Sequence, residues 1–147
     1  MGTRSTIAIK HGDRIKAIYC HWDGYLEHNG QVLHEHYQSS PKVNNLIALG
    51  DVSGLREEIG EKHDFGARYS EDDEAYTWTT FYGRDRGETG VEFRSFGSEE
   101  EWMDHYDHTG AEFYYLFDNG VWYVSAYRRK MEPLHEALAN LEKEVAQ

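Results

Sequence analysis

A strand-turn-strand pattern near the C-terminus constrains the fold more than any other stretch of the sequence. Two runs rich in apolar and aromatic residues, Phe113–Phe117 and Val121–Tyr127, flank the tripeptide Asp118-Asn119-Gly120. An Asn-Gly pair tolerates the positive φ angles that a tight hairpin turn requires. The pattern therefore predicts a β-hairpin at this end of the chain.

Further strands are predicted elsewhere. Ser5–Lys10 and Arg14–Cys20 are β-branched, roughly alternating and separated by a turn-like tripeptide, which indicates an opening hairpin. Tyr76–Tyr82 and Val91–Phe96 are also typical of strands, and a glycine-containing loop over 83–90 joins them. The second strand of the opening hairpin leads directly into the sequence HWDGY, so this segment is expected at a strand end.

Short helices are predicted between these strands. The apolar spacing of residues 26–37 is helical, although Gly30 interrupts the first turn. Ser40 is expected to cap a second helix that ends at Gly50, and residues 51–60 are expected to form a third short helix. The sequence Ser98-Glu99-Glu100-Glu101 matches a capping box and predicts a helix through Tyr106.

The last helix is predicted to begin at Pro133. Its apolar residues recur at intervals of four, three and four, as in an amphipathic helix that packs on a sheet or in a subunit interface. These residues are Leu134, Leu138, Leu141 and Val145. Hairpins alternating with short helices predict a single α+β domain over residues 1–147, with a mostly antiparallel sheet. An acidic stretch at about 61–74 is expected to be a mobile surface loop.

Composition limits the possible partners. The formal net charge is −12, from 27 acidic and 15 basic residues, and it opposes binding to duplex nucleic acid or to an anionic membrane. Aromatic residues are plentiful, with four Trp, eleven Tyr and six Phe. Cys20 is the only cysteine, so no internal disulfide or cysteine-based zinc cluster can form. The sequence lacks a signal peptide and a long apolar run, and we expect a soluble protein in a cytosolic compartment.

The segment HWDGYLEHNG offers metal ligands without a standard metal signature. His21, Asp23 and His28 could converge on a metal if the turn folds back, and they could equally form hydrogen bonds that hold the turn. Catalytic motifs are also missing, because the sequence has no GxSxG or HExxH pattern and no Walker or dinucleotide-binding glycine motif. The sequence therefore predicts no metal, no cofactor and no catalytic residue, and favours a protein that is not an enzyme.

A pocket for a nucleotide-like ligand can be assembled from other residues. Such a pocket needs a flat aromatic ring for the base and guanidinium groups for the phosphates. Candidate rings are Trp22, Tyr25 and Tyr82, candidate cations are Arg84, Arg86 and Arg94, and Asp23 is a further candidate contact. Arg84 and Arg86 occupy alternate positions and would lie on one side of an extended loop. The alternative is that the aromatic residues belong to the core and the arginines pair with surplus carboxylates.

Four segments resemble, in order and almost literally, a family of small bacteriophage and prophage proteins of unassigned function. They are MGTRSTIAI at the start of the sequence, IYCHWDGYLEHNG from Ile18, LIALGDVSGL from Leu46 and YGRDRGETG from Tyr82. The resemblance covers most of the chain. It implies a viral origin and the host cytoplasm as the location, but no activity.

A second resemblance concerns function. The length, the α+β order, the tryptophan after the second strand and the scattered arginines are similar to phage anti-defence sponges of the Thoeris type, which are oligomers that sequester cyclic nucleotide immune signals. This similarity implies that Trp22 stacks on a base and that Arg56 and Arg128 contact phosphates.

The resulting hypothesis is a non-catalytic, homo-oligomeric anti-defence protein. It would bind a cyclic nucleotide or a ligand of the cyclic ADP-ribose type in a pocket built around Trp22, Arg84 and Arg86. The alternatives are an acidic protein-binding antagonist of a host factor and, third, a hydrolase of a nucleotide signal.

Overall fold

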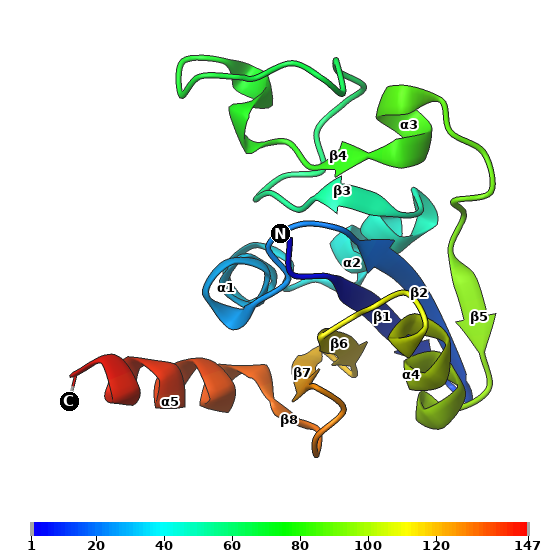
Figure 1. Cartoon of the computed structure of the whole chain (residues 1–147), viewed down its shortest axis with the longest axis vertical. Coiled ribbons are helices and arrows are strands. Elements are labelled where there is room, and N and C mark those ends of the chain that lie inside the picture. Colours follow the sequence, from blue (N-terminus) through cyan, green and yellow to red (C-terminus); the bar gives the residue numbers. More distant parts are fainter. Residues whose placement is uncertain (1, 147) are drawn as a thin grey trace.

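An eight-stranded sheet forms the centre of the molecule (Figure 1). The computed structural model describes residues 2–146, with side chains as far as residue 143. The strands are β1 (Ser5–His11), β2 (Arg14–Cys20), β3 (Val52–Gly54), β4 (Thr80–Phe81), β5 (Arg94–Phe96), β6 (Phe113–Asp118), β7 (Val121–Ala126) and β8 (Glu132–Pro133). The helices are α1 (Gln31–His36), α2 (Ser40–Ala48), α3 (Tyr82–Arg86), α4 (Glu99–Asp107) and α5 (Leu134–Ala146). A π-helical turn at Leu26–Gly30 precedes α1, and a 3₁₀ turn at Glu74–Thr77 precedes β4.

The sheet is mixed but mostly antiparallel, which confirms the predicted α+β class. Its strands follow the order β4-β3-β2-β1-β6-β7-β8, and β5 pairs with β2 outside this path. Five pairings are antiparallel, whereas β1 with β6 and β2 with β3 are parallel. Both predicted hairpins are present, as β1–β2 and β6–β7. Asn119 and Gly120 adopt φ angles of 51° and 81°, as the predicted turn requires.

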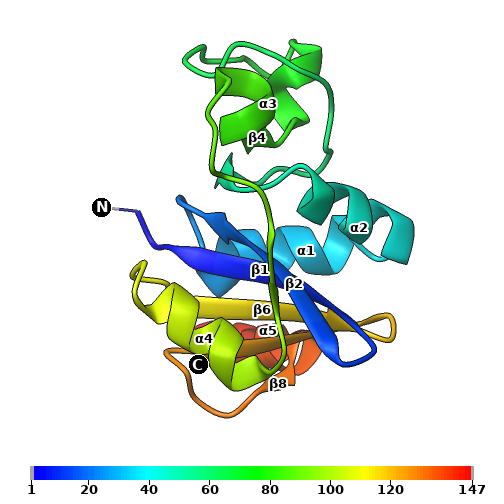
Figure 2. The same ribbon diagram turned by 90° about the vertical axis from the view of Figure 1, so that its right-hand side faces the viewer.

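Helices cover both faces of the sheet and enclose two apolar cores (Figure 2). The larger core lies between the sheet and α1, α2 and α5, and includes Ile7, Ile18 and Leu46. The smaller core lies under α4, where Trp102 and Tyr106 pack on the opposite face. Successive side chains of a strand point to opposite faces, so the central strands β1 and β6 are buried on both sides. Within the described part of the chain, no helix combines the length and apolarity needed to span a bilayer.

Helix α4 begins at the predicted capping box. The Ser98 hydroxyl accepts a hydrogen bond from the Glu101 amide at 3.1 Å. The Glu101 carboxylate in turn accepts one from the Gly97 amide at 3.0 Å. Trp102, in the first turn, is fully buried, and its indole N–H donates to the Thr6 hydroxyl of β1 at 3.0 Å. The cap thus positions a helix that covers the smaller core.

We expect Ser98→Ala to lower the free energy of unfolding by about 1 kcal/mol, because the substitution leaves a helix N-terminal amide without its partner. Urea denaturation measures this change. Ser98→Asp is the control, since its carboxylate can accept the same hydrogen bond and should preserve stability. A Ser98→Ala variant as stable as the wild type would contradict the capping role.

Three elements predicted between residues 51 and 90 differ wholly or in part from the structure. Residues 51–60 do not form a helix, because Val52 pairs with Cys20 at the end of β2 and the segment becomes β3. The predicted strand 76–82 is a 3₁₀ turn followed by the two-residue β4. The predicted loop 83–90 instead supplies most of α3, which ends where Gly87 adopts a φ of 74°.

Other boundaries lie close to the predicted ones. Ser39, rather than Ser40, caps α2, and α5 begins directly after Pro133. The predicted strand 91–96 shortens to β5. Leu134 and Leu138 are buried as predicted, while the Val145 side chain lies outside the described residues. The acidic stretch has no regular structure up to residue 73 and is mostly exposed.

Candidate functional site

The segment between β2 and α1 forms a tight turn against the start of β1. A Cβ at Gly24 would lie 2.7 Å from the Ser5 side chain, so only glycine allows this approach. The buried Asn29 amide donates to the Ser5 hydroxyl at 3.2 Å and to the Cys20 sulfur at 3.3 Å. Asp23 adopts a φ of 56°, which is uncommon for a residue other than glycine. Close packing and a buried amide therefore hold the turn in place.

Each residue of the possible metal site has its own hydrogen-bond partner. His21 Nδ1 bonds the Tyr19 hydroxyl at 2.7 Å, and His28 Nδ1 bonds the neighbouring asparagine at 2.9 Å. The Tyr25 hydroxyl donates to the Asp23 carboxylate at 3.2 Å. Among residues 2–143, no three His, Cys, Asp or Glu side chains are grouped so that they could hold a metal ion. These side chains form hydrogen bonds within the turn and with residues next to it.

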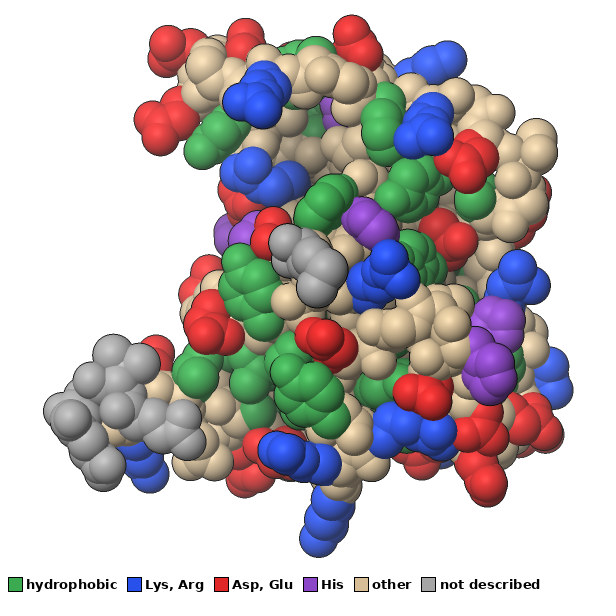
Figure 3. Space-filling view, in the orientation of Figure 1, with side chains coloured by type: hydrophobic (Ala, Val, Ile, Leu, Met, Phe, Trp, Pro, Cys, Tyr) green, Lys and Arg blue, Asp and Glu red, His purple; other side chains and the backbone are tan. Residues whose placement is uncertain are grey.

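A groove lies between this turn and the segment 54–80, which projects above the sheet. Figure 3 shows the left-hand outline indented between the upper part of the molecule and the body below it. The cavity has a volume of about 260 Å³. The lining side chains that matter for ligand chemistry are Asp23, His28, Arg56, His63, Tyr69, Tyr76 and Trp78. We call this cavity the groove.

Three aromatic rings form one wall of the groove. The backbone of Gly60, at a φ of 66°, packs so closely on the Trp78 indole that a Cβ there would lie 2.1 Å from the ring. The Arg56 guanidinium lies over the Tyr76 ring, 4.5 Å from its centroid. Tyr69 is the third ring. This wall combines flat faces with a cation, the two features that nucleotide recognition uses.

A buried ion pair on α3 holds the wall in place. Arg84 Nε donates to the Asp85 carboxylate at 2.9 Å, and both side chains are largely or fully buried. The terminal nitrogens of the guanidinium donate to the carbonyls of Ile59, Gly60 and Thr79 at 2.9, 3.1 and 2.8 Å. The Asp85 carboxylate also accepts from the amides of Phe81 and His63. The pair therefore ties the segment at 59–63 to β4.

Both ring nitrogens of His63 are already occupied. Nδ1 donates to the Glu61 carbonyl at 2.8 Å, and Nε2 bonds the Thr80 hydroxyl at 3.1 Å. The ring meets Tyr69 and Trp78 edge-on, with centroids 5.6 and 5.8 Å apart. His63 therefore supports the wall, and both of its ring nitrogens are bonded within the protein.

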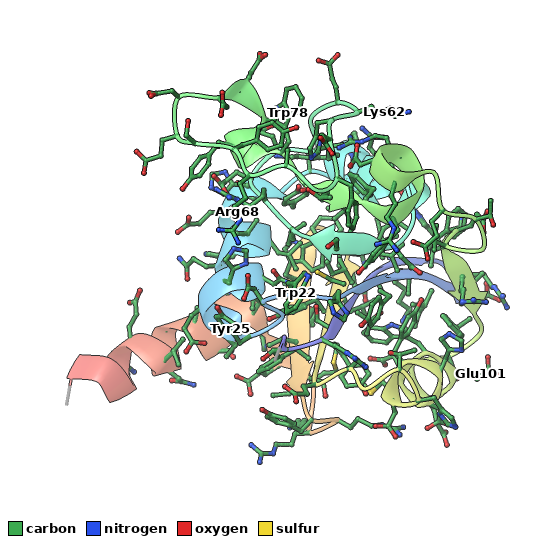
Figure 4. All side chains as sticks on the ribbon, turned by 45° about the horizontal axis from the view of Figure 1, so that its top comes forward. Trp22, Tyr25, Lys62, Arg68, Trp78 and Glu101 are labelled. Carbon is green, nitrogen blue, oxygen red and sulfur yellow. The ribbon has the colours of Figure 1, made fainter. Side chains whose placement is uncertain are left out.

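Arg56 brings positive charge to the groove, and Arg68 is the sequence neighbour of the lining residue Tyr69. Arg56 lines the groove, and its Nε bonds the Glu57 carboxylate at 3.1 Å. Arg68 lies between Trp78 and Tyr25 in the view of Figure 4. Among the described residues, no carboxylate lies within 4.0 Å of the Arg68 guanidinium.

The structure brings together only part of the predicted site. Asp23 and Arg56 both line the groove, and Tyr25 adjoins it through its bond to Asp23. Trp22 is 45% exposed and lines a separate cavity with Arg4. Trp22 therefore belongs neither to the core nor to the groove.

The predicted placement of Arg84 and Arg86 on one side of an extended loop is wrong. Both residues lie in α3, where Arg84 is buried in its ion pair. Arg86 is exposed, pairs with Glu88 at 3.6 Å and lies over the Phe65 ring at 5.0 Å. Tyr82 packs beside the same phenylalanine, at 5.5 Å between centroids. The helix separates the two guanidinium groups, and the predicted pocket of Trp22, Arg84 and Arg86 is not formed.

The two remaining predicted arginines have other surroundings. Arg94 lines a small cavity with Asp51 and His105. Arg128 donates to Asp104 of α4 at 2.6 Å. Neither lines the groove, so a phosphate contact from Arg128 next to Trp22 or the groove has no geometric support.

Most of the aromatic wall was not predicted from the sequence. Tyr69 lies in the stretch predicted to be an acidic surface loop, and Tyr76 and Trp78 lie in a predicted strand. A signal was present, because three aromatic residues and an arginine fall within residues 68–78. Their convergence depends on the ion pair of α3, which lies outside that stretch.

The sequence matches no family model, and it has no match among curated proteins or solved structures. The geometry of the groove is therefore the main basis for a functional interpretation.

Proposed function

We propose that the protein binds a small nucleotide-like ligand in the groove and holds it unchanged. The observation that supports this function is the gathering of three aromatic rings and the Arg56 guanidinium around one cavity of an acidic chain. Aromatic faces stack on any base, and guanidinium groups form paired hydrogen bonds to phosphate. The Asp23 carboxylate adds an acceptor for a hydroxyl or amino group of the ligand.

The chemistry of the groove favours binding over turnover. His63 has both ring nitrogens occupied, and His28 has one nitrogen bonded to the neighbouring asparagine. Cys20 lies beneath the turn, and burial raises the pKa of its thiol to about 11, so it stays protonated near neutral pH. A ligand held without conversion is removed from its target by mass action.

The proposed setting is the host cytoplasm during phage infection. The resemblance to phage and prophage proteins supports this setting, and the similarity to anti-defence sponges supports an immune signal as the ligand. We therefore propose a cyclic nucleotide or a cyclic ADP-ribose type compound, captured by a homo-oligomer. Such capture requires only that the groove has sufficient affinity for the signal and that the protein is present in excess over it.

Incubation of the purified protein with cyclic oligonucleotides and cyclic ADP-ribose isomers tests this function. Bound material is then released by heat and identified by mass spectrometry. We expect a bound compound to be recovered intact. Recovery of an altered compound would indicate a hydrolase instead, and failure of every compound to bind would contradict the proposal.

We expect Trp78→Leu to weaken ligand binding by about tenfold to a hundredfold, because a leucine keeps an apolar contact with Gly60 but removes the flat face for stacking. Isothermal titration calorimetry with the compound recovered in the binding experiment measures the change in affinity. Phe93→Leu is the control, since Phe93 is an exposed aromatic residue that lies outside the groove. Equal losses in both variants would indicate that the ligand does not stack in the groove.

A second candidate function follows from the charge of the surface. Acidic side chains are exposed at residues 71–74 and 99–101, and Figure 3 shows red groups at the upper left and lower right of the molecule. Such a surface favours an encounter with a basic host protein. Absence of nucleotide binding, together with salt-sensitive binding to one purified basic host protein, would support this antagonist in place of the ligand-binding function.

A further inference from the structure

Trp22 lies in a second cavity, distinct from the groove. The cavity has a volume of about 480 Å³. Its lining residues are Gly2, Arg4, His21, Trp22, Gly110 and Glu112. None of these residues lines the groove, and Figure 4 shows Trp22 apart from Trp78. We call it the Trp22 cavity.

The indole of Trp22 is held in place yet remains accessible. The backbone of Gly2 packs on the ring, since a Cβ there would lie 2.4 Å from Cε3. The His21 ring meets the indole edge-on, with centroids 4.6 Å apart and an interplanar angle of 88°. His21 is itself held by its hydrogen bond to Tyr19 at 2.7 Å. A large aromatic side chain that is fixed by its neighbours but 45% exposed offers a prepared surface for a flat ligand group.

Arg4 also lines this cavity. Its Nη1 donates to the Thr109 carbonyl at 2.9 Å, which leaves the other guanidinium hydrogens free of side-chain acceptors. Gly110 makes room for the group, because a Cβ there would lie 3.2 Å from Nη1 and the φ of 86° favours glycine. A single backbone bond thus orients the guanidinium without using its full donor set.

The charge of Arg4 is not cancelled by a bound carboxylate. Within the described residues, no Asp or Glu oxygen lies within 4.0 Å of its guanidinium. Glu112 lines the same cavity, but its contact with Arg4 is a backbone bond from its amide at 2.8 Å. Burial and the Arg4 charge lower the pKa of His21, as a positive field at the imidazole requires.

We propose that the Trp22 cavity is a second ligand site, which binds an aromatic phosphate monoester with its ring on Trp22 and its phosphate on Arg4. A guanidinium group matches a phosphate through two parallel hydrogen bonds, and an indole stacks on any flat ring. The cavity volume of about 480 Å³ is large enough for a single ring with one phosphate. The net charge of −12 disfavours a polyanion such as nucleic acid at the same place. This inference is independent of the ligand proposed for the groove.

Titration of the ¹⁵N-labelled full-length protein with phenyl phosphate tests the second site, because the indole N–H signals report on each tryptophan separately. The Trp22 signal, assigned by its loss in Trp22→Leu, is expected to shift. Inorganic phosphate lacks the ring, so its affinity should be lower than that of phenyl phosphate by at least about tenfold. Shifts confined to Trp78, or no shift at all, would overturn the proposal.

Variants separate this site from the groove. Arg4→Gln and Trp22→Leu should each weaken phenyl phosphate binding by about tenfold or more. Arg4→Lys keeps the charge but loses the paired hydrogen bonds, and an intermediate affinity is expected from it. Arg86→Gln should bind phenyl phosphate like the wild type, because Arg86 lines neither cavity. Native-like spectra confirm that each variant is folded. An unchanged affinity of folded Arg4→Gln for phenyl phosphate would contradict the second site, but it would not bear on the function proposed for the groove.

Discussion

Replacing Arg84 by methionine is expected to lower the free energy of unfolding by about 3–5 kcal/mol, the range for breaking a buried ion pair from one side. The substitution removes five hydrogen bonds and leaves the fully buried Asp85 carboxylate without its cation. The carbonyls at residues 59, 60 and 79 lose their donor at the same time. Urea denaturation followed by circular dichroism measures the loss. Ligand binding in the groove should fall with it, because the aromatic wall is no longer tied to β4.

Arg86→Met is the matched control for this experiment. The residue lies in the same short helix, but its guanidinium is exposed and its pairing with Glu88 at 3.6 Å is a surface contact. Such substitutions change stability by about 0.5 kcal/mol or less. Equal free energies of unfolding for the two variants would contradict the conclusion that Arg84 ties residues 59–63 to β4. A stable Arg84→Met variant that had lost ligand binding would instead indicate direct contact with the ligand.

Gly60→Ala is expected to cost about 2–5 kcal/mol, from two effects that act together. A left-handed backbone costs about 1–2 kcal/mol for a residue with a Cβ, and Gly60 has a φ of 66°. The added methyl group also meets the Trp78 indole at 2.1 Å, and such overpacking costs about 1–3 kcal/mol. Because the indole must move, the variant should also lose affinity for a ligand in the groove. Thermal denaturation and a shift of the Trp78 indole signal measure the two effects.

Gly87→Ala isolates the backbone contribution. Gly87 ends α3 with a φ of 74°, and no atom lies within 4 Å of the position that a Cβ would take. Its substitution should therefore cost only about 1–2 kcal/mol, from the left-handed conformation. The difference between the two alanine variants gives the cost of displacing Trp78. If both lose the same stability, the indole does not rely on close packing against Gly60.

Features that depend on a few adjacent residues could be predicted from the sequence. The Asn119-Gly120 turn follows from the positive φ angles that these residues tolerate, and the Ser98 cap follows from a hydroxyl placed before three free amides. The opening hairpin follows from the β-branched, roughly alternating runs Ser5–Lys10 and Arg14–Cys20 and from the turn between them. In these cases the interactions that stabilise the element lie within the segment itself.

Features that depend on distant partners could not be predicted in the same way. Residues 51–60 carry a helical spacing, but the edge of β2 offers backbone pairing to Val52, and β3 forms instead. The aromatic residues at 76 and 78 suggest a strand, yet the Gly60 backbone and the Arg84–Asp85 pair hold them as a wall. The residue types suited to a ligand could be recognised in the sequence, but not which of them lie close together. Trp22 and Arg56 were therefore assigned to one pocket, whereas they line two different cavities.

By itself the sequence determined the two strand hairpins, the Ser98 cap and the α+β class, because backbone propensities and side-chain periodicity act over a few residues. Only the tertiary structure decided which rings and guanidinium groups share a cavity, because that choice depends on how a buried arginine and two closely packed glycines arrange segments far apart in the chain.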